Sequence, residues 1–226
     1  MALQITGQAQ GIVQTTSQKS GAPSSISVGW HNELLASEML PRYTYGTLTG
    51  NQYSISSAGA GQTQVAANLF STAIATFQPI VGVYNPLTNN KNAVITKMWV
   101  GVVGQAASAT VTGGFMLVVS SGQSITQAGT VPVNHLTLKQ QGSTMIGLVN
   151  QALTGATGSL LVLRPVASTN PNTTNTAPTI TPFSVYEEQT EGAIIVPPGG
   201  VIGIANGITG TTNTFQAGMS WIELPI

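Results

Sequence analysis

Two short apolar runs within residues 192–207 flank the tetrapeptide PPGG at 197–200. Proline cannot donate to a strand ladder, and glycine accepts the positive φ of a tight turn. The pattern therefore predicts two core strands joined by a tight turn, in a hairpin. Nothing in this stretch suggests proton transfer, so we expect its role to be architectural.

Similar strand-like runs recur along most of the chain, separated by segments rich in Gly, Pro and Asn. Besides the two strands around PPGG, the expected strands are residues 79–84, 93–103, 110–121, 135–140, 144–149, 159–166 and 214–226. Residues 159–166 look buried, and residues 64–77 are expected to be a strand or irregular. About eight strands without βαβ alternation predict an all-β fold, an antiparallel β-sandwich of jelly-roll type.

The last strand has the clearest alternation. Residues 215, 217, 219 and 221 are Phe, Ala, Met and Trp, which places four apolar side chains on one face. Ile222, Leu224 and Ile226 then make the strand apolar on both faces. We expect this end of the strand to be covered.

The N-terminal residues 1–42 differ from the rest of the chain. Residues 1–29 are small and polar, which leaves two interpretations open: a disordered tail, or an extended arm that orders on a neighbouring subunit. Residues 30–42 have apolar residues at helical spacing, including Met39, and predict one short helix. The expected organisation is an arm with a short helix over 1–42 and a jelly-roll domain over 43–226.

Charged residues are unusually scarce. Only 5% of the chain is charged, compared with about 25% in typical domains, and the formal net charge is zero. Such a surface promotes association. Scattered basic residues provide no patch for nucleic acid or for a membrane surface. The N-terminus is not expected to be a signal peptide, and no run is long enough for a membrane span.

The sequence offers no convincing catalytic or metal-binding constellation. It has no Cys and no Asp, and its two histidines, His31 and His135, lie far apart. A Ser–His–Asp arrangement would lack its Asp, and a metal site needs three or four converging ligands. We therefore expect no enzyme activity, no catalytic residue, no metal and no cofactor.

The order of the charges predicts pairing. Residues 43–186 contain four cations and no carboxylate, whereas residues 187–226 contain four carboxylates and no cation. Pairs across the fold or across a subunit boundary would fix register. Glu187, Glu188 and Glu191 form the densest acidic cluster and are candidate interface residues.

A resemblance supports an assembled role. Residues 66–103, the segment 192–207 and the closing SWIELPI resemble virion structural proteins of tailed bacteriophages. The resemblance implies a jelly-roll subunit on the capsid surface, often a trimeric decoration or cement protein, with further copies and a major capsid protein as partners. Trp30, Met39, Tyr43 and Tyr45 are further candidate interface residues near the arm.

Two alternatives remain open. The chain could be a jelly-roll major coat subunit, in which long arms also occur. It could instead be a carbohydrate- or receptor-binding virion module, in which Trp30, Tyr43, Tyr45 and Tyr53 would stack on sugars.

Overall fold

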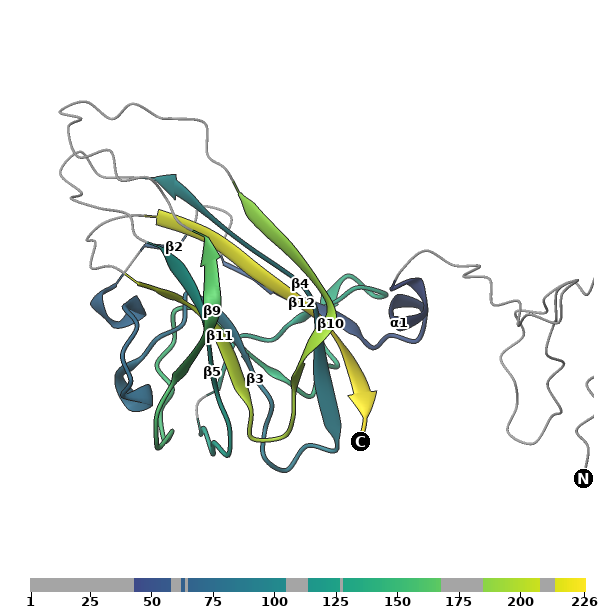
Figure 1. The fold of residues 1–226 in the computed structure, drawn as a ribbon. Coiled ribbons are helices and arrows are strands. Elements are labelled where there is room, and N and C mark those ends of the chain that lie inside the picture. The colour runs from purple at the N-terminus through teal and green to yellow at the C-terminus, as the bar shows by residue number, and fades with distance from the viewer. Residues whose placement is uncertain are drawn as a thin grey trace, which may run out of the picture. The chain divides into compact units, whose positions relative to one another are not determined.

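The computed structural model describes residues 43–57, 62–63, 65–104, 114–126, 128–167, 185–207 and 214–226. The described residues form two antiparallel sheets and very little helix, so the predicted all-β sandwich is confirmed (Figure 1). The sandwich lies within the compact unit Tyr45–Ile226. The expected arm, including the helix over 30–42, lies outside the described residues.

Within the described residues, the larger sheet has seven strands. Its order is β10 (Tyr186–Val196), β4 (Lys91–Gly104), β12 (Thr214–Pro225), β1 (Gln52–Ser56), β6 (Val133–Asn134) and β7 (Lys139–Gln140), and β2 (Gln62–Thr63) also pairs with β12. The strands β4 and β12 are the longest and pair along nearly their whole length. They form the centre of this sheet.

The smaller sheet has five strands in the part of the chain that the structure describes. Its order is β8 (Ile146–Leu148), β3 (Val81–Tyr84), β11 (Val201–Asn206), β5 (Phe115–Ser120) and β9 (Leu161–Ala167). The described helical turns are α1 (Thr44–Leu48), η1 (Ala66–Asn68) and η2 (Ile74–Thr76). With the last two, the described residues 65–77 are irregular, which is one of the two conformations expected for 64–77.

The strands of four or more residues pair in a nested order. The first of these eight pairs with the last, β1 with β12, and the second pairs with the seventh, β3 with β11. The third and sixth, β4 and β10, also pair, as do the fourth and fifth, β5 and β9. The pairs alternate between the two sheets. The chain is therefore arranged like one long hairpin rolled into a sandwich.

The main hydrophobic core lies between the sheets. Its largest members include Phe115, Phe215 and Trp221, and the two Phe rings meet edge to face with centroids 5.2 Å apart. A second cluster covers the other face of the five-stranded sheet with residues from the irregular segments, including Ile74, Phe77 and Leu153. Because the centre of that sheet is buried on both faces, every residue of β3 and β11 is buried, and the two strands are apolar except for Asn206 and the hydroxyl group of Tyr84 rather than alternating.

The last strand is partly as predicted. Phe215, Ala217, Met219 and Trp221 are all buried in the core, as the alternation indicated. The expectation of a covered end is wrong for this chain, because Leu224 and Ile226 are exposed. The inward-facing series continues instead to Glu223, which is fully buried.

The PPGG turn is tight, but it does not make a hairpin. Gly200 N donates to Pro197 O at 2.8 Å, and Gly199 has a φ of 76°, as the third residue of a type II turn requires. The strands on either side belong to different sheets, since β10 pairs with β4 and β11 pairs with β3 and β5. The predicted hairpin is therefore wrong, and the turn is a corner that carries the chain between sheets. Of the two predicted core strands, β11 is buried throughout, whereas β10 is an edge strand on which Ile195 is exposed.

Two strand predictions need correction. Residues 135–138 form a turn between β6 and β7, because the Asn134 side chain accepts hydrogen bonds from Leu136 N at 2.9 Å and Thr137 N at 3.1 Å. Residues 161–163 do form a strand, but their side chains are exposed rather than buried, because β9 is the edge of its sheet. The apolar composition of residues 161–163 correctly predicted a strand but wrongly indicated that its side chains are buried.

Candidate functional site

The predicted pairing of charges occurs within the chain. Lys91 Nζ lies 3.1 Å from Glu223 Oε2, and Lys97 Nζ lies 2.8 Å from Glu187 Oε1. Arg164 forms an ion pair with Glu188 across the two edge strands, β9 and β10. Three of the four cations between residues 43 and 186 are thus paired with carboxylates of the same chain, which leaves few unpaired charges on the sandwich.

The candidate interface residues are in different situations. Glu187 and Glu188 lie on β10, the edge of the seven-stranded sheet, and Glu191 lies exposed at its irregularity with a φ of 52°. Tyr43 is half-buried with a φ of 70°, and Tyr45 belongs to α1, although its side chain is not described. Trp30 and Met39 lie outside the described residues. The structure therefore gathers the three glutamates on one strand.

A buried carboxylate cluster joins the end of β12 to the segment before β8. Glu223 Oε1 accepts from Ser143 Oγ at 2.6 Å and Thr144 N at 3.1 Å, and Glu223 Oε2 accepts from Thr144 Oγ1 at 2.9 Å. Lys91 supplies the opposite charge. A buried carboxylate with this many donors is a structural element that holds the segment around Thr144.

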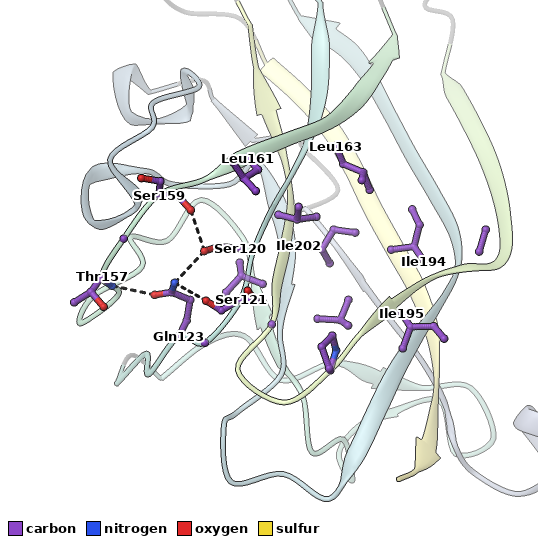
Figure 2. A pocket seen from close by; sticks show the side chains of 18 residues that line it. Ser120, Ser121, Gln123, Thr157, Ser159, Leu161, Leu163, Ile194, Ile195 and Ile202 are labelled. Carbon is purple, nitrogen blue, oxygen red and sulfur yellow. Dashed lines mark hydrogen bonds between the residues drawn. The ribbon is translucent and has the colours of Figure 1, made fainter.

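A groove of about 560 Å³ opens between the edges of the two sheets. On one side lie Leu161 and Leu163 of β9, and on the other lie Ile194 and Ile195 of β10 (Figure 2). Ile202 of β11 and Val119 of β5 line the groove between them. The lining contains no charged residue, so the groove is an uncharged and largely apolar surface.

One end of the groove is polar, and its geometry is fixed by Gln123. The Gln123 amide donates to Ser120 Oγ at 2.9 Å and to Ser121 O at 3.0 Å, and it accepts from Thr157 N at 2.9 Å. Ser120 Oγ in turn donates to Ser159 O at 3.1 Å (Figure 2). These internal hydrogen bonds use most of the donors and acceptors of the Gln123 side chain. Gln123 therefore stabilises the wall of the groove and is not a candidate for binding a ligand.

Other candidates are weaker. The described parts of the chain hold no group of three or more His, Cys, Asp or Glu that could bind a metal. Burial lowers the pKa of His135, which lies in the turn between β6 and β7. Tyr53, one of the proposed sugar-stacking residues, is buried and stacks on Trp221 instead, so its ring is not available for a sugar. Among the described helices, none is long and apolar enough to span a membrane.

No protein-family model, no curated protein and no solved structure matches this chain. The site must therefore be judged on its geometry.

Sequence reasoning missed two features of this region. Glu223 follows Phe215, Ala217, Met219 and Trp221 in steps of two, so the alternation itself could have placed it inside. The groove had no comparable signal, because it depends on β9 and β10 being the edges of different sheets. The apolar residues of β9 and β10 are visible in the sequence. Such runs predict strands, but they do not indicate which other strands lie beside them.

Proposed function

We propose that this chain is a structural subunit of a bacteriophage virion, most simply a decoration or cement protein on the capsid surface. Its partners would be further copies of itself, as a homotrimer, and a major capsid protein. It would act by binding and stabilising the capsid lattice through its arm and its subunit interfaces, without catalysis, cofactor, nucleic acid or membrane.

The observation that carries this proposal is the nested pairing of the eight longer strands. The first strand pairs with the last, the second with the seventh, the third with the sixth and the fourth with the fifth. This is the arrangement of a jelly roll, which viral capsid and lectin domains share. The resemblance of residues 66–103 and 192–207 to phage virion proteins favours the capsid among these. We infer the jelly-roll topology from this order.

The distribution of charge gives independent support. Only 5% of the chain is charged, and three of its cations form ion pairs with carboxylates of the same chain, so the described surface carries few unpaired charges. Neutral hydrogen-bonding groups can be buried at an interface without the desolvation penalty of an unpaired charge. Such a surface suits a subunit that is enclosed by neighbours.

The test is to locate the protein in particles that carry it. Light scattering on the purified chain is expected to give three times the 23.2 kDa mass of one chain. Electron microscopy of particles labelled with an antibody against the chain should place the label over the head. A label restricted to the tail, or a monomer that turns over a small molecule, would overturn the proposal.

The alternatives are outcomes of the same experiments. A head that consists of this chain alone would make it the major coat subunit. A reproducible signal on a glycan array would favour a carbohydrate-binding module, although the burial of Tyr53 removes one of the aromatic residues expected to serve it.

A further inference from the structure

We propose that the groove between β9 and β10 binds the N-terminal segment of a second copy, residues 2–17, as an added β-strand. The proposal rests on the self-association inferred above and names one contact that would produce it.

Both strands that border the groove have an unpaired edge in the described part of the chain. Among the residues that the structure describes, β9 pairs only with β5, and β10 pairs only with β4. Each therefore presents backbone N–H and C=O groups that another strand can use. An extended peptide that adds to a free edge gains main-chain hydrogen bonds, and adjacent pockets then select its side chains.

The two edges are protected at one end only. Arg164 and Pro165 occupy the C-terminal half of β9, and Glu187 and Glu188 occupy the N-terminal half of β10. Charged residues and proline are the usual means by which proteins keep edge strands from pairing. The Arg164–Glu188 ion pair joins these protected halves.

The other halves carry no such protection and form the groove. Leu161 is 66% exposed, Leu163 is 48% exposed and Ile195 is 57% exposed. Three apolar side chains at unprotected edges create a surface that favours association. Because the lining holds no charge, a charged guest would lose hydration without gaining a partner. The guest is therefore an uncharged strand with apolar residues at alternate positions.

Residues 2–17 have this chemistry. They contain no charged residue, the first being Lys19, and Leu3 and Ile5 alternate with Gln4 and Thr6. The described residues begin at position 43, so 42 residues of the sequence precede them. At 3.3 Å per residue, a fully extended segment of that length spans at most roughly 140 Å, which is enough to reach a neighbouring molecule. The proposed guest thus has suitable composition and reach.

Engineered disulfides test the contact directly, because the chain has no native cysteine. One full-length batch carries Leu3→Cys or Ile5→Cys, and the other carries Leu161→Cys or Leu163→Cys. After mixing and mild oxidation, we expect disulfide-linked dimers that contain one chain of each kind, because paired strands bring Cα atoms within disulfide distance. Far-UV circular dichroism verifies that each variant is folded.

The matched control is Leu138→Cys, mixed with the same arm variants. Leu138 is 80% exposed, more than either leucine of the groove, and lies in the turn at the opposite edge of the seven-stranded sheet. We expect at least tenfold less mixed dimer with this control. Equal cross-linking at Leu138, or none at either groove position, would overturn the proposal.

Two further outcomes separate this inference from the proposed function. In the double variant Ile5→Cys/Leu163→Cys, a disulfide within one chain in place of the mixed dimer would overturn the commitment to a second copy. A chain that remains trimeric without any groove cross-link would overturn the contact and leave the virion role standing. If the antibody label were absent from the capsid while the groove cross-link still formed, the virion role would be overturned and the groove contact would stand.

Discussion

Two carboxylates of this chain pair with lysines of the same strand and yet occupy opposite environments. Glu223 pairs with Lys91 and its side chain is 0% exposed, whereas Glu187 pairs with Lys97 and its side chain is 47% exposed. Glu223 also accepts hydrogen bonds from Ser143 and Thr144. Both pairs join a cation of β4 to a carboxylate further along the chain, so burial is the main difference between them.

That difference determines what each pair can do. A carboxylate removed from water is costly unless its partners replace the lost hydration, and deleting a member of such a cluster leaves the others buried and unpaired. An exposed pair remains hydrated and screened by salt, so its net contribution to stability is small. We therefore expect the Glu223 cluster to support the fold and the Glu187 pair to influence mainly contacts with other molecules.

The largest expected effect is that of Glu223→Ala. Its loss leaves Lys91, Ser143 and Thr144 without their acceptor, and the free energy of unfolding should fall by about 3–5 kcal/mol. Urea denaturation monitored by tryptophan fluorescence measures this. Leu224→Ala is the control, because that neighbouring side chain is half exposed and should cost under ~1 kcal/mol. A loss at Glu223 no larger than at Leu224 would remove the distinction between the two carboxylates.

An intermediate effect is expected for Lys91→Met. The carboxylate of Glu223 keeps its bonds to Ser143 and Thr144 but loses its opposite charge, so the free energy of unfolding should fall by about 1–3 kcal/mol. Combining Lys91→Met with Glu223→Gln in a double-mutant cycle isolates the pair. Additive losses would mean that the lysine and the carboxylate do not interact energetically.

The sequence could predict the strands better than their surroundings. The alternation from Phe215 to Trp221 identified both the strand and its buried face, because strand periodicity is a local property. The charge order correctly indicated pairing across the fold. It could not indicate which pair is buried, since that depends on where the segment around Thr144 packs.

The errors have the same origin. The pattern HLTLKQ is typical of a strand, but Asn134 accepts from two following N–H groups and turns the chain. The run at 161–163 looks like a core strand, but only the order of strands in the sheet shows that it is an edge. The groove combines two such edges, so no local pattern could reveal it.

A small effect is expected for Glu187→Gln. Because this pair is exposed, its removal should change the free energy of unfolding by under ~1 kcal/mol, and the change should shrink further at high salt. Urea denaturation at low and high ionic strength measures both. A loss comparable to that of Glu223→Ala, or one that salt does not reduce, would show that exposure does not separate the two pairs.

The smallest expected effect concerns His135, which is affected by burial rather than by a charged partner. Burial disfavours the imidazolium and lowers the pKa of His135 in the folded state below 6.5. The unfolded chain then binds the proton more readily, so the stabilising contribution is present above pH 6.5 and is lost as pH falls through the lowered pKa. In His135→Gln, the difference in unfolding free energy between pH 7.5 and pH 5.5 should therefore be smaller than in the unmodified chain. An unchanged difference would mean that this imidazole is as well hydrated in the folded state as in the unfolded one.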